Sequence, residues 1–285
     1  MSRSLVALVA KYFAVVLSPV VLLAVLGYVS VFATREYAGE QMKRLASTSL
    51  YQLESISDNF LSEVRATAVA MGTATPLLRT VRERLQNSQV DLNDLQELKL
   101  VLNVVNTAAH ARPHVQSIYI YLEGFDAVLS SEAGIVDRET MKDRSWWPAY
   151  VNAPRDVGTW AARRDYTPLG ESGPRKSVIS LYQRLFTLSA REIRGVVVLN
   201  VRESAVREVL RSAALSSQHR FVVLDAAGHV ITSDLGDPEL TRAAMTSVEA
   251  GEQSFVKAGT EYMVNESTSE ETQWRYVMVT PRSVS

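Results

Sequence analysis

The feature that most constrains the fold of this chain is an uncharged apolar stretch near its amino terminus, residues 12–33. At about 1.5 Å of rise per residue, a helix of this length matches the roughly 30 Å hydrocarbon core of a bilayer. A secretory signal peptide is the alternative, since Val31-Phe32-Ala33 has the form of a cleavage site. The apolar region of a signal peptide is only about 7–15 residues long. The stretch therefore favours an uncleaved transmembrane helix, in which Pro19 is tolerated.

Basic residues flank the predicted span on both sides and do not decide its orientation. Arg3 and Lys11 precede it, and Arg35, Lys43 and Arg44 follow it. A short tail is the simpler side to retain in the cytoplasm, because long domains are translocated largely regardless of their charge. We therefore predict a single-pass protein of the cell membrane, with residues 1–11 cytoplasmic and residues 34–285 extracytoplasmic.

The composition limits the chemistry that the chain can perform. It has no cysteine and 4 histidines, which excludes thiol nucleophiles and cysteine zinc sites and argues against a histidine-rich metal site. Lys+Arg is 30 and Asp+Glu is 31, so no basic excess points to a nucleic acid as partner. No phosphate-binding loop, dinucleotide-binding glycine motif, zinc-protease helix or nucleophile elbow is present. We predict no enzyme, no catalytic residue, no metal and no cofactor.

Residues 34–86 are predicted to form a long stalk helix that continues out of the membrane. Apolar residues recur along it at spacings of three, four or eight, which indicates an amphipathic helix. This stripe consists of Met42, Leu45, Leu53, Ile56, Phe60 and Val64. It either pairs with a second copy of the chain in a homodimer or packs against its own domain, and the two roles are compatible. Thr75-Pro76 is predicted to kink or break the helix.

Two α+β modules with antiparallel sheets are predicted after the stalk helix. The first, residues 87–203, has a helix at 92–109, strands at 115–122, 127–131, 177–186 and 193–201, and a loop with a short helix between the second and third strands. In the first strand, Ile118 and Ile120 face one side and Tyr119 and Tyr121 the other.

The second module, residues 204–281, repeats this plan on a smaller scale. Its predicted helices are 204–215 and 238–250, and its predicted strands are 221–225, 229–233, 252–257, 261–267 and 275–280. We expect residues 282–285 to form a tail that leads toward a second membrane span.

Residues 143–147, Asp-Arg-Ser-Trp-Trp, form a rare cluster in the first module. The Arg144 guanidinium is a fork that holds a carboxylate, and each tryptophan offers a flat wall and an N–H donor. Together they predict a pocket for a small ligand with an anionic end. The alternative is that both tryptophans fill the core beneath a loop while Arg144 pairs with Asp143 or Asp165.

The whole plan resembles the double Cache (dCache) sensor domain: a membrane anchor, a long helix, a membrane-distal PAS-like module and a smaller membrane-proximal one. Arg144-Ser145-Trp146-Trp147 resembles the Arg-x-Trp-Tyr segment of amino-acid-binding members, with Trp147 in place of the tyrosine. Residues 195–201 (GVVVLNV) resemble the Gly-x-x-x-x-Asp-Ile strand that ends the distal module, and residues 274–281 (WRYVMVTP) resemble the last strand before a second span. Such domains occur in YesM-type sensor histidine kinases and in membrane-anchored AraC-type regulators.

The resemblance implies an extracytoplasmic sensor module that binds a small ligand in its distal module and transmits the signal across the membrane. It places the ligand among Arg144, Trp146, Trp147, Tyr166, Tyr182, Arg184 and Asn200. Asn200 stands where amino-acid-binding members carry an aspartate that holds the ligand ammonium. An amide does not supply a full negative charge. We therefore expect a carboxylate, a sugar or an oligosaccharide rather than a free α-amino acid.

Two other functions stay open at the level of sequence. One is a ligand-free scaffold that dimerises, or docks on another membrane protein, through the stripe on the stalk helix. The other is an exported hydrolase, against which the absence of any nucleophile–base motif argues.

Overall fold

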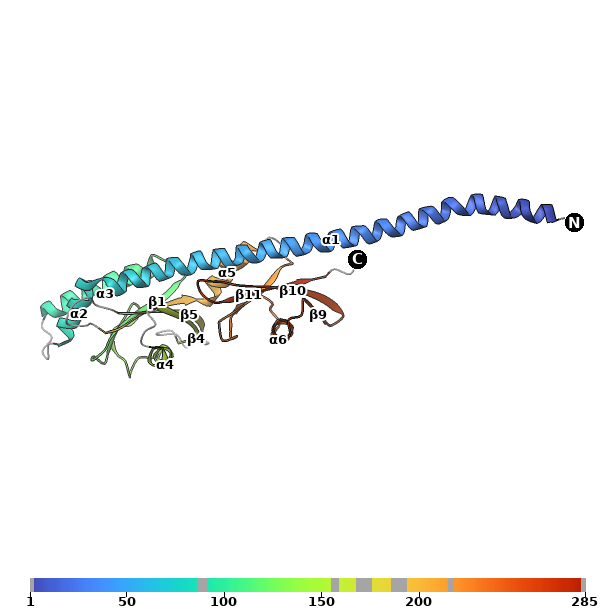
Figure 1. The fold of residues 1–285 in the computed structure, drawn as a ribbon. Helices are drawn as coiled ribbons and strands as arrows, with labels where there is room; N and C mark the ends of the chain where they lie inside the picture. The colour runs from blue at the N-terminus through green and yellow to red at the C-terminus, as the bar shows by residue number, and fades with distance from the viewer. Residues whose placement is uncertain are drawn as a thin grey trace. The chain divides into compact units, whose positions relative to one another are not determined.

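The structure of the chain is a computed structural model, shown in Figure 1. It describes residues 3–86, 92–154, 159–167, 176–185, 194–214 and 218–282. The chain forms two compact units, Met1–Thr48 and Ser49–Ser285. Both β-sheets lie in the second unit. The α+β class with a long helix and two antiparallel sheets agrees with the prediction.

Helix α1 (Arg3–Thr73) is one continuous helix, and its carboxyl-terminal part belongs to the second unit. There its buried positions recur at spacings of three and four residues, which is the pattern of a helix with one face on a core. They are Leu50, Leu53, Ser57, Leu61, Val64, Ala68 and Met71.

The predicted stripe on this helix separates into two faces. Leu53 and Val64 are buried, whereas Leu45 and Ile56 are 52% and 37% exposed. Phe60 is half-buried, and the side chain of Met42 lies outside the described residues. The helix therefore packs on its own domain through one face and leaves apolar side chains exposed on another.

The stalk predicted at residues 34–86 is two helices rather than one. The break falls at Ala74, beside the predicted Thr75-Pro76, and α2 (Thr75–Gln86) begins there. A proline in the first turn of a helix removes no intrahelical hydrogen bond, because the first N–H groups have no partner. Helix α3 (Leu92–His110) matches the predicted helix at 92–109 and packs against the first strand of the distal sheet.

The distal module has a six-stranded sheet of order β3-β2-β1-β6-β5-β4 in which every neighbouring pair is antiparallel. Four of its strands fall where the sequence predicts strands, and β3 and β4 lie in the region predicted as a loop with a short helix. The strands are β1 (Val115–Leu122), β2 (Ala127–Ser130), β3 (Gly134–Asp137), β4 (Thr159–Tyr166), β5 (Lys176–Arg184) and β6 (Gly195–Arg202).

The two faces of this sheet differ, as the alternation in β1 predicts. Tyr119 and Tyr121 belong to a core that also holds Trp146 of helix α4 (Trp146–Asn152). Gly195 begins the central strand where a Cβ atom would lie 2.0 Å from the carbonyl oxygen of Tyr121, so only glycine fits. The turn predicted at 189–191 between β5 and β6 lies outside the described residues.

The proximal module has a five-stranded antiparallel sheet of order β8-β7-β11-β10-β9. Asp237 caps its second helix by accepting a hydrogen bond from the backbone of Glu239, and Pro238 follows at the first position. Every predicted helix and strand of this module is present within a few residues. The elements are α5 (Glu203–Ala213), β7 (Arg220–Leu224), β8 (Val230–Ser233), α6 (Pro238–Glu249), β9 (Ser254–Lys257), β10 (Thr260–Thr268) and β11 (Arg275–Pro281).

The predicted membrane span at residues 12–33 lies within helix α1. Within the described part of the chain, no helix has an 18-residue window that is apolar enough for a candidate span. Many side chains of the predicted span at residues 12–33 lie outside the described residues. Those that are described include exposed Leu22, Leu23, Leu26, Tyr28 and Phe32.

Candidate ligand-binding site

The rare cluster at residues 143–147 leads into helix α4, which covers the tyrosine face of the distal sheet. Trp146 is buried among the side chains of this face, with its ring centroid 6.2 Å from that of Tyr119 and 5.9 Å from that of Tyr121. Trp147 is half-buried and stands edge-on to Trp146 at 5.4 Å. The tryptophan pair therefore joins α4 to the sheet through aromatic packing.

Two strand residues hold the backbone around α4. The Tyr182 hydroxyl donates a hydrogen bond to the carbonyl oxygen of Trp146 at 3.3 Å. Arg184 donates to the carbonyl oxygens of Ala153 at 3.3 Å and of Pro154 at 3.2 Å, just beyond the end of the helix. Its guanidinium carbon also lies 5.2 Å from the centre of the Tyr150 ring. Both residues fix the position of α4 over the sheet.

A buried ion pair lies beneath α4, between Arg164 of β4 and Asp143. Their side chains are 6% and 4% exposed. Nη1 of Arg164 lies 2.7 Å and 2.8 Å from the two carboxylate oxygens of Asp143. The same carboxylate accepts hydrogen bonds from the Tyr119 hydroxyl at 2.8 Å and from the Ser145 hydroxyl at 2.9 Å. Every charge in this pair is thus matched and hydrogen-bonded, as burial requires.

Asn200 lies at the centre of the same network. Its Oδ1 accepts from Nη2 of Arg164 at 2.6 Å and from the Ser180 hydroxyl at 2.7 Å, and its Nδ2 donates to Ser117 at 2.8 Å. The register explains this arrangement, because Ser117 on β1 and Ser180 on β5 both pair with Asn200 on β6. The polar row therefore crosses three adjacent strands and ends at Arg164.

Tyr166, the last residue of β4, ties this region to the β2–β3 connection. Its ring is buried in the core beneath α4, and its hydroxyl donates to a carboxylate oxygen of Glu132. Burial, and then this bond to Glu132, raise the pKa of Tyr166. Burial also raises the pKa of Tyr182 to about 12 and the pKa of Tyr119 further still. These hydroxyls are therefore neutral donors at physiological pH.

The residues predicted to contact a ligand differ in their exposure to solvent. Trp146, Tyr166, Tyr182 and Asn200 are buried, Trp147 and Arg184 are half-buried, and Arg144 is exposed. Within the described part of the chain, the Arg144 side chain makes no hydrogen bond or ion pair. The predicted alternative paired Arg144 with Asp143 or Asp165, and the structure pairs Asp143 with Arg164 instead.

Sequence reasoning misses Arg164 because it assigns the residues of β4 to a loop. The segment Arg163-Arg164-Asp165 is typical of an exposed connection. The one available signal is alternation, which puts Ala162, Arg164 and Tyr166 on the same face of an extended strand. Arg164 therefore shares a strand face with Tyr166, which the sequence predicts to contact the ligand. Among the described residues, no group of three histidine, aspartate or glutamate side chains is arranged to hold a metal ion.

Comparison with known proteins identifies the fold. No protein-family model matches the chain, and no curated protein matches it in sequence. Solved structures with the same fold are ligand-binding domains of sensory proteins. The sensory domain of the Campylobacter jejuni chemoreceptor Tlp3 with isoleucine bound is 12% identical, with a TM-score of 0.57 over 86% of this chain and 93% of that one.

Two further structures widen the comparison. The ligand-binding domain of Mlp24 with asparagine is 15% identical, with a TM-score of 0.53 over 85% of this chain and 94% of that one. The extracellular domain of the putative histidine kinase soHK1S-Z6 is 18% identical, with a TM-score of 0.52 over 84% and 94%. The fold is that of the extracellular sensor domains of chemoreceptors and histidine kinases, which confirms the resemblance to double Cache domains at the level of fold.

Proposed function

We propose that the chain is the extracytoplasmic sensor module of a signal-transduction protein, and that its small ligand binds beneath α4 in the distal module. The buried Arg164–Asp143 pair carries this proposal. Apolar side chains stabilise a core at least as well as a buried ion pair does. The need for stability therefore does not explain why this pair is present. The pair is well suited to exchanging its partners for the charges of a ligand. The likeness of the fold to sensor domains supports this function over an enzymatic one.

The ion pair also selects the chemical class of ligand. A ligand with only a negative charge would take Arg164 and leave Asp143 buried without a cation. A ligand with only a positive charge would leave Arg164 unpaired in the same way. An uncompensated buried charge costs about 3–5 kcal/mol. A zwitterion satisfies both side chains at once, and a free α-amino acid is the smallest common example.

This reasoning changes the ligand expected from the sequence. The sequence argument against α-amino acids rested on the missing charge at Asn200. Asp143 places a buried carboxylate in the same hydrogen-bond network, 2.7 Å from the Arg164 guanidinium that Asn200 also contacts. Two of the structures with a similar fold contain bound isoleucine and bound asparagine, which supports an α-amino acid as the ligand. A carboxylate, sugar or oligosaccharide is the competing class.

Helix α1 connects both modules and is the proposed route of the signal. Toward the distal module, the carboxylate of Glu63 lies 3.6 Å from Nε of Arg112. Toward the proximal module, Asp58 accepts a hydrogen bond from the Ser269 hydroxyl at 2.9 Å. In the same direction, Nη1 of Arg65 lies 2.6 Å from Oε1 of Glu271. A ligand that prefers one position of α4 changes the populations of the conformations of the domain. Helix α1 transmits this change toward the membrane.

Residues 12–33 are the proposed membrane anchor. Leu23, Tyr28 and Phe32 are 68%, 74% and 61% exposed on a helix, and a bilayer is the environment in which such a surface is stable. The chain has no native cysteine, so single cysteines introduced before and after the segment report its topology without background. Labelling of both positions in intact cells by an impermeant thiol reagent would contradict a cytoplasmic amino terminus.

A homodimer through α1 is the proposed assembly. Leu45 and Ile56 are eleven residues apart, which places them on the same face of a helix, and both are exposed. An Ile56→Asp substitution should lower the mass measured by light scattering from dimer to monomer, whereas Ser62→Asp, at an exposed position on another face of the helix, should not.

The function is tested by thermal denaturation and calorimetry of the full chain in detergent with α-amino acids, simple carboxylates, amines, sugars and oligosaccharides. A ligand at 100 times its Kd adds about 2.7 kcal/mol of stability. We expect stabilisation by one or more α-amino acids and none by their singly charged analogues. Binding of a sugar or of a simple carboxylate alone would overturn the ligand class. No response to any compound would favour the ligand-free scaffold.

A further inference from the structure

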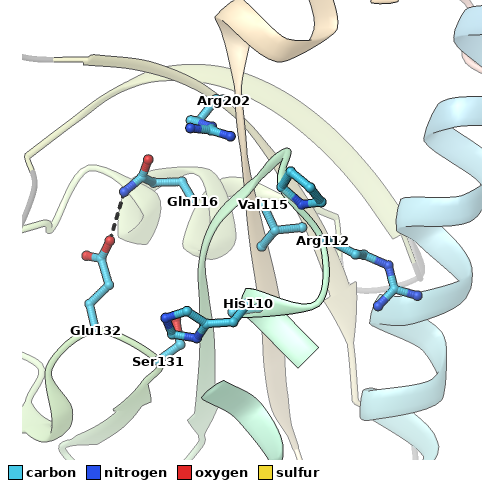
Figure 2. Close-up of a pocket in the computed structure, with 9 residues that line it drawn as sticks. His110, Arg112, Val115, Gln116, Ser131, Glu132 and Arg202 are labelled. Atoms are coloured by element: carbon cyan, nitrogen blue, oxygen red, sulfur yellow. Dashed lines mark hydrogen bonds between the residues drawn. The ribbon is translucent and has the colours of Figure 1, made fainter. Parts of the chain in front are cut away.

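A pocket lies outside the α4 region, where α3 ends, β1 begins and β6 ends (Figure 2). We call it the junction pocket, because Arg202 at its rim is followed directly by Glu203, the first residue of α5. It has a volume of about 580 Å³, enough for a small organic molecule. Its polar lining residues include His110, Gln116, Ser131, Glu132 and Arg202.

One end of the junction pocket carries hydrogen-bond acceptors. Nδ1 of His110 lies 2.7 Å from the carbonyl oxygen of Asn106. A carbonyl only accepts, so Nδ1 carries the proton, and Nε2 of the neutral ring is an acceptor. Figure 2 shows this imidazole beside Ser131, with the Glu132 carboxylate at the same side of the pocket.

Glu132 is a carboxylate with neutral partners. One of its oxygens accepts from the side-chain amide of Gln116 at 2.9 Å and the other accepts from the Tyr166 hydroxyl. Among the described residues, Glu132 forms no ion pair. Its negative charge is therefore available to a cation that enters the pocket.

The other end carries a guanidinium. Arg202 is exposed at the rim, and among the described residues its side chain has no ion-pair or hydrogen-bond partner. Arg112 does not compete for this role, because it points toward α1 in Figure 2, where Glu63 lies 3.6 Å from its Nε. Arg202 and Glu132 thus face one pocket with opposite charges and are not paired with each other.

We propose that the junction pocket binds a small zwitterion, with its amine held by Glu132 and Nε2 of His110 and its acid group held by Arg202. A ligand with both charges is the class that compensates both ends of the pocket, whereas a simple anion would bring its charge near Glu132 and a simple amine would bring its charge near Arg202. The residues that carry this proposal are not those that carry the proposed ligand site beneath α4, so either proposal can fail without the other.

Occupation of the junction pocket reaches the α4 region through a single residue. Glu132 is the hydrogen-bond acceptor of Tyr166, whose ring lies in the core with Trp146. An amine that attracts Glu132 weakens the acceptor that Tyr166 uses. The two sites are therefore coupled, and a ligand at either one changes the affinity at the other.

The test uses the four histidines as local probes. The full chain is labelled with ¹⁵N-histidine, and the imidazole signals are followed by NMR during titration with glycine, β-alanine or γ-aminobutyrate. Butyrate and butylamine are the singly charged controls. The His110 signal is assigned with a His110→Gln variant. We expect at least one zwitterion to shift the His110 signal, with an affinity about tenfold or more above that of either control.

Three variants show whether the zwitterion acts on His110 from within the junction pocket. Glu132→Gln and Arg202→Gln should each weaken the zwitterion effect on His110 about tenfold, and Arg242→Gln on α6 should leave it unchanged. The other histidine signals show whether each variant is folded. A His110 signal that ignores every zwitterion, or that responds equally to butyrate or butylamine, would overturn the proposal. Binding that survives both Glu132→Gln and Arg202→Gln would also overturn it.

Discussion

The amide oxygen of Asn200 accepts a hydrogen bond from Nη2 of Arg164 at 2.6 Å, and this bond joins the centre of the distal sheet to its edge strand. The same oxygen accepts from the Ser180 hydroxyl, so both of its lone pairs are used. The amide is neutral and offers no charge to a ligand. The negative charge of the network belongs to Asp143 instead. Asn200 therefore positions the guanidinium, and Asp143 balances it.

An Asn200→Asp substitution tests this division of roles. The new carboxylate and Asp143 would share one guanidinium, which leaves an excess buried negative charge and costs about 1–3 kcal/mol without ligand. The Ser117 hydroxyl can turn to donate, so the row across the strands stays satisfied. We expect a lower Tm without ligand and a larger rise in Tm with an amino acid. An unchanged Tm in both conditions would contradict the assigned roles.

The Arg164–Asp143 pair predicts an asymmetry between two arginines. Arg164→Met leaves the Asp143 carboxylate buried without a cation and should cost about 3–5 kcal/mol in the free energy of unfolding. Arg144→Met changes an exposed side chain and should stay within about 0.5 kcal/mol. Urea denaturation followed by tryptophan fluorescence measures both.

A compensating variant distinguishes the ion pair from a general packing effect. Arg164→Met combined with Asp143→Leu removes both charges and should recover much of the stability lost by Arg164→Met alone. A double variant as unstable as the sum of its two single variants would show that the pair acts only through packing.

The parts of the fold that the sequence predicts are those in which periodicity and burial agree. Ile118 and Ile120 alternate with Tyr119 and Tyr121, and this alternation identifies β1 and both of its faces. The same is true of the valine-rich β6 and of the whole proximal module. The break at Ala74, directly before Thr75-Pro76, follows from the geometry of proline.

The parts that the sequence does not predict depend on tertiary contacts. Strand β4 is an edge strand with charged residues, and Arg164 faces inward because the Asp143 carboxylate and the Asn200 amide oxygen bind its guanidinium. Arg144 and Arg164 are equivalent by residue type. Alternation with Ala162 and Tyr166 is the one local signal for Arg164, and it applies only once the segment is known to be a strand.

Gly195 provides a test of the contact between β1 and β6. A Cβ atom there would lie 2.0 Å from the carbonyl oxygen of Tyr121, so Gly195→Ala must push the two central strands apart. Overpacking of this kind costs about 1–3 kcal/mol. Gly124→Ala is the control, because Gly124 has a positive φ of 89° and open space around it. Thermal denaturation should show the larger loss in Tm for Gly195→Ala, and equal losses would contradict the close approach.

Two histidines that contact α1 predict a loss of stability in mild acid. His114 packs edge-on to Phe60 with ring centroids 4.7 Å apart, and Nδ1 of His219 lies 3.1 Å from the Ser49 hydroxyl. Burial lowers the pKa of both imidazoles below the ordinary value of 6.5. As the pH falls through that ordinary value, the unfolded chain binds protons that the folded chain does not. The free energy of unfolding therefore decreases as the pH is lowered from about 7.

A His219→Gln variant measures the share of one histidine in this slope. Glutamine keeps a polar group near Ser49 but does not titrate, so the decrease in stability between about pH 7 and pH 5.5 should be smaller than in the unmodified chain. His229→Gln is the matched control, because the His229 side chain is 80% exposed. Urea denaturation across this pH range gives the slope for all three proteins. If His219→Gln kept the full slope, or if His229→Gln removed as much of it, the contact of His219 with α1 would not be the source of the acid sensitivity.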